Sequence, residues 1–366
     1  MRRLVLLGGG HAHLQVLRAL HNAPLRDTQL TLVSPFPRLV YSGMVPGVIA
    51  GHYEPAACTI PIAPWAQRAG ADFVQAACVG IDAAARSLRL DDGREIAYDL
   101  LSLDIGATMN RDAIPGAREH ALFVRPIERF VALWHELLAR ARDTALDLVV
   151  VGGGAAGVEL ALALRHRLDE PSRVSLVTGG AALLQSYPGR VQRLGRRALQ
   201  RQGVALYEQS CSRIEASGVQ LADTRWLRCD RALLAIGAAA PTWLSGSGLA
   251  LDAQGFVATG ATLQSVSHPE VFAAGDVASR VDAPRPRSGV HAVRAGPPLA
   301  HNLRRRVDGA PLQGYRPQQR SLNLLACGDR RAIVSWGPLA AEGGWAWRWK
   351  DRIDRAFVGT FAVPTP

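Results

Sequence analysis

The chain has 366 residues, of which 48% are hydrophobic and 20% are charged, and its formal net charge is +11. This composition is typical of a globular protein with two or three domains and excludes a mainly disordered chain. The sequence contains no run of about 18 apolar residues, which excludes a transmembrane helix. The apolar run Leu4–Leu7 is too short for a signal peptide, so we expect a cytoplasmic protein.

Arginine carries almost all of the positive charge, because Lys350 is the only lysine. The arginines are scattered, and the densest groups, Arg196–Arg197 and Arg304–Arg306, are short. A nucleic-acid-binding protein would concentrate them in a patch or stripe. We therefore expect no nucleic-acid partner, although an anionic ligand or an acidic membrane surface would suit this charge.

Cysteine usage argues against a disulfide-rich or zinc-binding protein. The cysteines are Cys58, Cys78, Cys211, Cys229 and Cys327. No two of them lie within ten residues of each other, so the sequence has neither a CxxC redox pair nor a zinc-ligand spacing. Their odd number is typical of reduced thiols in the cytosol.

The chain opens with a strand, a glycine turn, a helix and a second strand. These elements are expected at Leu4–Leu7, Gly8–Gly10, His13–His21 and Leu30–Val33. The same order returns 144 residues later, at Leu146–Val151, Gly152–Gly157, Val158–Leu168 and Val174–Val177. The continuous apolar strands are typical of parallel sheets that are covered on both faces. Two such units predict an α/β fold with two Rossmann-type dinucleotide-binding domains.

Further strands indicate how the chain moves between these domains. A strand is expected at Phe73–Ile81, and an antiparallel ribbon is expected to pair Ser87–Leu90 with Glu95–Leu100. The chain is expected to leave the first domain after a strand at Leu101–Gly106 and to return to it at a strand at Ala232–Gly237. Strands at Leu322–Leu325 and Ala332–Trp336, followed by a helix, predict a small C-terminal α+β domain. The expected boundaries are 1–108 and 235–310 for the first domain, 109–234 for the second and 311–366 for the third.

The second glycine turn has the GxGxxG spacing of a nucleotide-binding site. Gly152 would allow the tight turn, Gly154 would let the backbone approach a pyrophosphate, and Gly157 would let helix and strand pack closely. The phosphates would then lie at the positive N-terminus of the helix. The alternative is a tight turn without a ligand.

The first turn departs from this spacing. Gly8 and Gly10 are present, but His13 stands where the third glycine belongs. Either the imidazole of His13 points into the site, or His13 is a packed residue at the start of the helix. His11 and His13 together do not predict a metal site, because no third ligand is evident.

The ends of later strands carry the remaining signals. In dinucleotide-binding units, an acid at the end of the second strand usually binds the ribose. Here the two second strands end in Val33-Ser34 and in Val177-Thr178-Gly179, and neither carries an acid. Ser34 can still hydrogen-bond a hydroxyl, while the choice between NADH and NADPH stays open. Another apolar strand ends in Gly275-Asp276, which is either a simple turn or a carboxylate placed to bind ribityl or ribose hydroxyls.

Together, these motifs carry a family resemblance. Five segments follow the order seen in the pyridine nucleotide–disulfide oxidoreductase superfamily: Gly8–His13, Asp104–Ala107, Gly152–Glu159, Ala235–Gly237 and Phe272–Asp276. Over about residues 1–310 the chain resembles the type II NADH dehydrogenase branch of these two-dinucleotide flavoproteins, which lacks a redox disulfide. Tyr41–Gly47 and Ala292–Pro298 resemble, more closely, the flavoprotein fused to or encoded beside selenide, water dikinase.

The resemblance implies two cofactors and their sites. FAD would bind the first unit and NAD(P)H the second, with the nicotinamide stacked on the flavin. The implied FAD site contains Gly8, Gly10, His13, Ser34, Arg38, Gly43, Gly106, Gly275 and Asp276, and the implied NAD(P)H site contains Gly152, Gly154 and Gly157. Glu159 matches an acid that lies near the nicotinamide in this branch, although a helix-start carboxylate is also favoured by the helix dipole.

The chain also departs from that branch. Type II NADH dehydrogenases carry glutamines in the quinone-facing helix, whereas Ser288–Gly296 contains none. Quinone reduction is therefore in doubt, and His291 and Arg294 could instead meet an anionic or protic substrate or lie on the surface. Sulfide:quinone oxidoreductases share the fold but need catalytic cysteines, which the isolated cysteines do not match.

A C-terminal stripe of large apolar residues leaves two interpretations open. The stripe consists of Trp345, Trp349, Ile353, Phe357 and Phe361, with Arg348, Lys350, Arg352 and Arg355 between them. Such a helix could lie on the inner face of a membrane as a peripheral contact. It could also pack against the same chain or against a partner in a homodimer.

The sequence therefore predicts an FAD-dependent oxidoreductase. Hydride would pass from NAD(P)H to the flavin, and electrons would then pass to a small-molecule acceptor, either a quinone or a selenium or sulfur compound. We predict Glu159 and His291 as catalytic residues and no bound metal. The alternative is a flavin-binding partner or sensor module for a selenium-handling kinase such as selenide, water dikinase, without NAD(P)H turnover.

Overall fold

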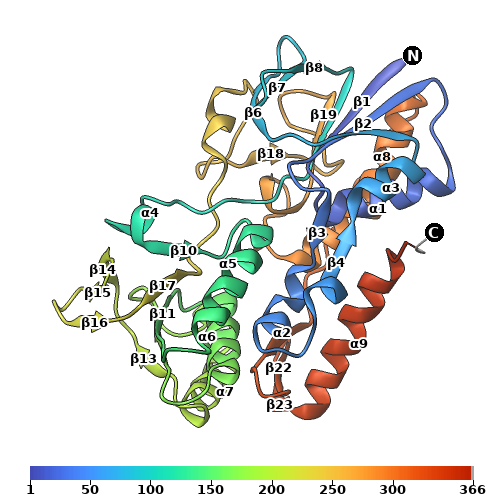
Figure 1. Ribbon diagram of the computed structural model, residues 1–366. Coiled ribbons are helices and arrows are strands. Elements are labelled where there is room, and N and C mark those ends of the chain that lie inside the picture. The colour runs from blue at the N-terminus through green and yellow to red at the C-terminus, as the bar shows by residue number, and fades with distance from the viewer. Residues whose placement is uncertain (364–366) are drawn as a thin grey trace.

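Two five-stranded parallel sheets form the framework of the protein (Figure 1). The computed structural model describes residues 1–363. The first sheet contains β1 (Arg2–Leu7), β2 (Thr28–Val33), β5 (Ala71–Val74), β9 (Leu100–Leu103) and β19 (Val271–Ala273). The second contains β10 (Ala121–Phe123), β11 (Asp147–Val151), β12 (Arg173–Val177), β13 (Ala205–Tyr207) and β17 (Arg231–Leu234). The predicted α/β fold class with two Rossmann-type units is confirmed.

Four strands of each sheet repeat one topology, whereas the fifth, an edge strand, is the last in chain order in the first sheet (β19) and the first in the second (β10). Their strand orders are β19-β9-β1-β2-β5 and β10-β17-β11-β12-β13, so β1 and β11 hold the same central place. In each sheet, the two strands that follow the central strand are added on one side of it. A later strand, β9 or β17, is then added on its other side. The glycine turns after β1 and β11 therefore lie at topological switch points, where open α/β sheets bind ligands.

Each parallel sheet has helices on one face and a small antiparallel sheet on the other. Leu4 and Leu6 of β1 face α1, α3 and α8, while Val5 and Leu7 face β6–β8. Because both faces are covered, the strands read as continuous apolar runs. The helices are α1 (His11–Asn22), α2 (Val45–Ile49), α3 (Ile62–Arg68), α4 (Ala117–His120), α5 (Ile127–Arg140), α6 (Ala155–Arg167), α7 (Gly189–Arg201), α8 (Gly289–Val307) and α9 (Gly344–Thr360).

The remaining strands form small sheets around this framework. They are β3 (Arg38–Val40) with β4 (Thr59–Pro61), the antiparallel sheet β6 (Cys78–Asp82), β7 (Ser87–Leu90) and β8 (Glu95–Ala97), and the antiparallel sheet β14 (Cys211–Glu215), β15 (Gly218–Leu221) and β16 (Trp226–Arg228). Others are β18 (Val257–Thr259) with β20 (Ala278–Arg280), and β21 (Asn323–Ala326), β22 (Ala332–Trp336) and β23 (Leu339–Gly343).

Four expected strands are divided or shortened in the structure. The strand expected at Ala232–Gly237 ends at Leu234, the last residue of β17. The single strand expected at Phe73–Ile81 is wrong, because β5 ends at Val74 and the chain turns before β6 joins a different sheet. The expected ribbon exists between β7 and β8, but Glu95–Leu100 divides between β8 and β9. The strand expected at Leu101–Gly106 ends at Leu103, where the backbone leaves the sheet. An apolar run continues through such turns, so its length overestimates the strand.

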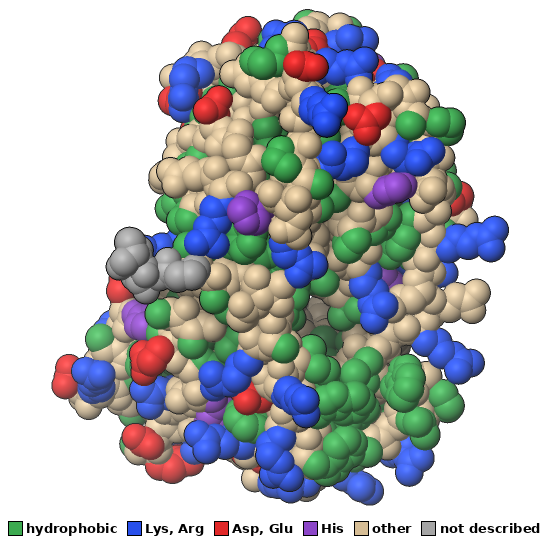
Figure 2. Space-filling model, turned by 90° about the vertical axis from the view of Figure 1, so that its right-hand side faces the viewer, with side chains coloured by type: hydrophobic (Ala, Val, Ile, Leu, Met, Phe, Trp, Pro, Cys, Tyr) green, Lys and Arg blue, Asp and Glu red, His purple; other side chains and the backbone are tan. Residues whose placement is uncertain are grey.

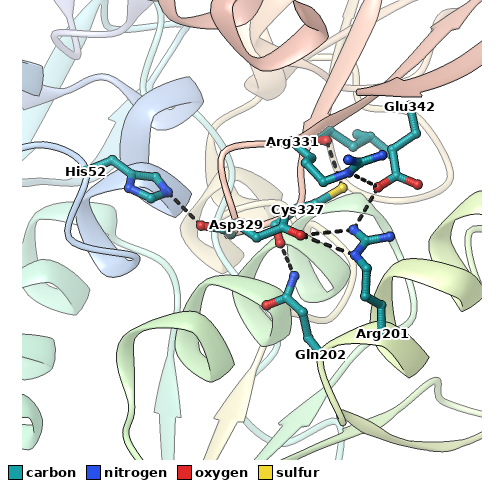
Figure 3. A network of polar contacts seen from close by, with 9 residues as sticks. His52, Arg201, Gln202, Cys327, Asp329, Arg331 and Glu342 are labelled. Carbon is teal, nitrogen blue, oxygen red and sulfur yellow. Dashed lines mark hydrogen bonds and ion pairs between the residues drawn. The ribbon is translucent and has the colours of Figure 1, made fainter. Parts of the chain in front are cut away.

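The C-terminal segment packs against the second unit through polar contacts (Figure 3). Arg201 of α7 binds Asp329 at 3.1 Å and Glu342 at 2.7 Å, and Arg331 binds the same glutamate at 3.0 Å. His52, just after α2, donates from Nε2 to the carbonyl of Gly328 at 2.6 Å. These contacts join three parts of the chain. The boundaries expected for the domains stay a prediction, and residues 364–366 lie outside the described residues.

Helix α9 divides the C-terminal apolar stripe between two surroundings. Phe361 is buried against Trp65, and Phe357 packs on Tyr41 with ring centroids 4.7 Å apart, whereas Trp345 and Trp349 are exposed. A spacing of four residues advances about 40° around a helix at each step, so the ends of the stripe differ by about 160°. The stripe therefore does not lie on a single face of α9, and its two ends have different surroundings. Across residues 1–363, we find no helix with the length and apolar character needed to span a bilayer.

Candidate functional site

The first glycine turn brings the end of β1 against the chain that follows β9. Gly8 has φ +96°, and a Cβ at this position would lie 2.4 Å from the carbonyl oxygen of Asp104. The Gly8 N–H donates to the carbonyl of Val33 at 2.8 Å. Gly10 then precedes the first residue of α1. The positive φ and the close backbone contact both require glycine at position 8.

His13 fills the interior of this turn. Its side chain is fully buried, and Nδ1–H donates to the carbonyl of Gly8 at 2.6 Å. Because Nδ1 carries the proton, Nε2 accepts from the hydroxyl of Ser102 at 2.8 Å. Both ring nitrogens are thus used inside the protein. The structure therefore does not support the predicted contact between His13 and a cofactor, and the packed interpretation describes this residue.

The second turn has the geometry that the GxGxxG spacing predicts. Gly152 has φ +134°, and a Cβ on Gly157 would lie 1.8 Å from the Gly152 carbonyl oxygen. Any side chain at position 157 would therefore push α6 away from β11. In contrast, a Cβ on Gly154 would meet no atom within 4 Å. The start of α6 therefore presents its backbone to open space, as a phosphate site requires.

The Gly275-Asp276 segment lies close to the first turn. Gly275 has φ +69°, and the Asp276 carboxylate accepts from Arg125 at 3.0 Å. His11 lies in the electrostatic field of this ion pair, and its buried Nε2 has no hydrogen-bond partner among residues 1–363. Burial lowers the pKa of His11 to about 4. Gly106, with φ +70°, follows β9 and faces open space.

Three other residues of the implied FAD site have different surroundings. Ser34 is buried, and its hydroxyl donates to the carbonyl of Phe36 at 3.0 Å, so its single proton is not available to a ribose. Arg38 is exposed at the start of β3. The carbonyl of Gly43 accepts from the Lys350 ammonium at 2.5 Å, which ties the loop before α2 to α9.

Glu159 joins the second unit to the C-terminal segment. Its carboxylate accepts from the backbone N–H of Ala326 at 2.7 Å. Burial raises the pKa of Glu159 to about 7, although the positive charge of Lys350 opposes this rise. Lys350 also binds Asp354 at 2.6 Å, and Tyr41 bonds to the same aspartate. A buried polar cluster therefore lies where the two units and α9 meet.

His291 borders a small cavity beside the Gly275-Asp276 segment. The cavity has a volume of about 70 Å³ and is bordered by arginines 280, 285 and 287. Nδ1 of His291 is buried without a partner. Burial and the charges of Arg285 and Arg294 hold the pKa of His291 below its usual value. His291 therefore stays neutral near neutral pH and can accept or donate a hydrogen bond.

The fold brings into the site several residues to which the sequence assigned no role there, namely His11, Tyr41, Arg125, Lys350 and Asp354. They come from distant segments, so no common spacing connects them. Signals existed for His11 and Tyr41, which lie in the segments Gly8–His13 and Tyr41–Gly47, and for Lys350, the only lysine among 42 basic residues. The five cysteines are free thiols, and burial raises the pKa of Cys327, which argues against a reactive thiolate.

The residues present fit two dinucleotides. The open space beside Gly154 fits a pyrophosphate at the start of α6. At the first unit, the unpaired Nε2 of His11 and the Asp276 carboxylate offer hydrogen bonds to a polar ligand. The two-unit fold and these turns define the class of two-dinucleotide flavoprotein oxidoreductases.

Comparison with known proteins agrees with this class. The family model for pyridine nucleotide-disulphide oxidoreductase matches residues 2–296. The chain is 27% identical over 238 residues to the external alternative NAD(P)H-ubiquinone oxidoreductase B4 of Arabidopsis thaliana mitochondria, covering 56% of this chain and 40% of that protein. It is 26% identical over 353 residues to the demethylphylloquinone reductase NdbB of Synechocystis sp., covering 91% and 86%.

Among solved structures, NDH2 from Plasmodium falciparum in complex with NADH has the same fold. Its TM-score is 0.79 at 13% identity, and the match covers 99% of each chain. The chain therefore belongs to the pyridine nucleotide-disulphide oxidoreductase family. The predictions of an FAD-dependent NAD(P)H oxidoreductase and of its two cofactors are confirmed at the level of the family.

Restoring the missing third glycine should harm the first unit. We expect His13→Gly to destabilise the protein by about 3–5 kcal/mol, because it removes two buried hydrogen bonds, leaves a cavity and places glycine in a helix. Urea unfolding followed by circular dichroism measures this change. As a control, His21→Gly makes the same exchange at an exposed position of α1 and should cost about 1 kcal/mol. Equal losses in the two variants would contradict the role assigned to His13.

Proposed function

We propose that the chain passes hydride from NAD(P)H bound at the second turn to FAD bound at the first. When bound, FAD supplies the redox chemistry, because it accepts hydride and gives up two electrons to an acceptor. The observation that carries this proposal is the repeated glycine turn, placed at the switch point of each parallel sheet. Gly152 and Gly154 would lie at the pyrophosphate of the nicotinamide cofactor, and Gly157 would keep α6 close to β11.

Glu159 is proposed to act beside the nicotinamide ring. Hydride departure leaves a positive charge on that ring, and an ionised carboxylate would stabilise the charge in a site of low dielectric. The Ala326 N–H fixes one carboxylate oxygen at 2.7 Å, and Lys350 favours the ionised form. Glu159 would therefore be most effective above pH 7.

The acceptor is proposed to be small and to approach through the cavity beside His291. Arg280 and Arg285 give this cavity a positive charge, and its volume of about 70 Å³ suits a small anion. These properties favour a sulfur or selenium anion over a quinone, although both relatives named above are named for quinones. We assign His291 as the hydrogen-bond donor to this acceptor.

A second candidate function is a flavin-binding partner of a selenium-handling kinase such as selenide, water dikinase. The two segments that resemble the kinase-associated flavoprotein approach each other in the fold. A Cβ on Gly289, three residues before Ala292–Pro298, would lie 3.6 Å from the Ser42 hydroxyl within Tyr41–Gly47. Binding of the kinase without NAD(P)H turnover would favour this alternative.

An apolar patch on α9 and the hairpin before it is proposed to contact the membrane. Figure 2 shows hydrophobic side chains gathered at the lower right, with basic side chains around them. The apolar patch consists of Trp336, Leu339, Trp345, Trp349 and Ile353, which are 37% to 61% exposed. Exposed tryptophans beside arginines 348 and 352 suit a membrane interface. The protein would then be peripheral to the inner face of a membrane, with homodimer formation as the alternative.

The proposed function is tested by mixing the purified, FAD-loaded protein with NADH or NADPH without oxygen. We expect the flavin absorbance near 450 nm to bleach within seconds and to return when an acceptor is added. A comparison of sulfite, selenite and a soluble quinone identifies the acceptor class. Flavin that stays oxidised with both nicotinamide cofactors would contradict the proposed hydride transfer.

The pH dependence of bleaching tests Glu159. If the ionised form is the active one, a pKa near 7 predicts that the rate rises about tenfold from pH 6 to pH 8. Glu159→Gln keeps the shape but not the charge, so its rate should be low and independent of pH over this range. Stopped-flow absorbance measures the bleaching rates of the wild type and of Glu159→Gln. The matched control is Glu208→Gln, which makes the same exchange at an acid paired with Arg196. A pH-dependent rate in Glu159→Gln would exclude Glu159 as the titrating group.

Vesicle sedimentation tests the apolar patch. Replacing Trp345 and Trp349 by serine should lower binding to vesicles that contain anionic lipid at least about tenfold, because two indole rings no longer enter the interface. Trp226→Ser removes an exposed tryptophan on β16 and should leave binding unchanged. If the double variant binds vesicles normally but loses a dimer seen by light scattering, the patch is a dimer interface instead.

A further inference from the structure

Asp104 and Ala235 occupy matching positions in the two units. Each follows the strand beside the central strand, and each donates its backbone N–H to the last residue of that central strand, at 2.8 Å and 2.9 Å. Their carbonyl oxygens would lie 2.4 Å and 2.3 Å from a Cβ on Gly8 and Gly152, respectively. The backbone therefore has the same geometry at this position in both units. The side chain differs, because Asp104 carries a carboxyl group and Ala235 a methyl group.

The Asp104 carboxyl group lies against the start of α1. Its Oδ2 accepts from the backbone N–H of His13 at 2.9 Å, and the residue is 3% exposed. A Cβ on Gly10 would lie 2.5 Å from the carboxyl atoms, and a Cβ on Gly275 would lie 2.4 Å from Oδ1. The carboxyl group is therefore enclosed by both glycine segments of the implied FAD site.

The same space is open in the second unit. Gly154 corresponds to Gly10, and a Cβ there would meet no atom within 4 Å. In this family of folds the second glycine exists so that the backbone can approach a pyrophosphate. At the first unit, a buried acid therefore stands beside the helix end that would receive two negatively charged phosphates. Two anions on one helix end repel each other strongly in a site of low dielectric.

We propose that FAD binding at the first unit is coupled to the uptake of one proton from solvent by the Asp104 carboxyl group. This inference rests on the proposed binding of FAD there. The proton removes the repulsion and gives the acid an O–H that can donate a hydrogen bond. Deprotonation would weaken the hold on the cofactor, so Asp104 makes retention of FAD sensitive to pH.

The groups around Asp104 support this linkage. Burial raises the pKa of Asp104 to about 7, and the nearby Asp276 adds to the rise, while N–H donors of α1 oppose it. From α1, His11 and His13 also face this region, but burial lowers the pKa of each to about 4, so neither changes charge near pH 7. Arg125 pairs with Asp276 at 3.0 Å. Among these groups around the first turn, Asp104 is thus the one whose charge changes in the neutral range.

The test measures the dissociation constant of FAD for the apoprotein between pH 6 and pH 9, from the quenching of flavin fluorescence. A higher pKa of Asp104 in the complex means that affinity falls as pH rises. Above pH 7 the dissociation constant should rise by up to about tenfold per pH unit, until the pKa of the complex is reached. Titration calorimetry at pH 8 in buffers of different ionisation enthalpy should show close to one proton taken up per FAD.

Two variants at position 104 separate charge from shape. Asp104→Asn keeps the shape, and Asp104→Ala copies the second unit; both should bind FAD with an affinity that is independent of pH and with no proton uptake. Asp99→Asn, at an acid paired with Arg3 on the surface, should behave like the wild type. A pH-independent affinity in the wild type, or an unchanged pH dependence in Asp104→Asn, would overturn the proposal.

The second unit provides the reciprocal test. Ala235→Asp should lower the affinity for NADH between pH 6 and pH 8 by more than in the wild type, in which Glu159 is the group of this unit with a pKa of about 7. The fluorescence of NADH measures both affinities. If the variants at position 104 do not fold, the wild-type calorimetry still decides. An apoprotein that binds no FAD at any pH would defeat the proposed function itself, whereas pH-independent binding would defeat this inference alone.

Discussion

The site depends on one backbone contact that occurs in both units. In each unit, the first glycine of the turn lies against the carbonyl oxygen of the residue that follows the adjacent strand, Asp104 for Gly8 and Ala235 for Gly152. A Cβ on Gly8 or Gly152 would come within 2.4 Å of that oxygen, so both positions require glycine. This contact holds the two strand ends at the switch point side by side. The helix that follows must then begin at the edge of the sheet, with its N–H groups directed at any ligand. Because this glycine–carbonyl contact occurs in both units, the chain has two turns with the same backbone arrangement.

The sequence predicted this part of the fold because its signals are local. The apolar runs and glycine turns at residues 4–10 and 146–157 are patterns of adjacent residues, so they are visible in the sequence without knowledge of distant contacts. The environment of His13 could not be predicted, because its partner Ser102 lies 89 residues further along the chain. Lys350 reaches Gly43 across 307 residues, so no spacing could place it. The strand ends were overestimated because an apolar run does not show where a chain leaves its sheet.

The C-terminal segment connects the two sites to each other. Ala326 binds Glu159 of the second unit, while Lys350 binds the loop at Gly43, which belongs to the first. Lys350 belongs to α9, and Trp345 and Trp349 of the apolar patch are exposed on the same helix. A ligand or surface that shifts α9 would therefore act on the hydrogen bonds at both sites. The arrangement favours an enzyme whose two units must keep a fixed separation for hydride transfer, which is sensitive to small displacements.

With FAD at the first turn and NAD(P)H at the second, as proposed, the differences between the two turns would match the different residence times of a cofactor and a substrate. A nicotinamide substrate must leave after every turnover, and the second turn presents open space beside Gly154 and a small Ala235. A flavin cofactor remains bound through many turnovers, and the first turn is filled by His13 and Asp104, which are both buried. Filling a site with buried polar groups makes binding depend on each group having its partner and its correct charge. Under the proposed assignment, the first unit would hold FAD most tightly when Asp104 is protonated, while the second unit would have no such dependence at Ala235.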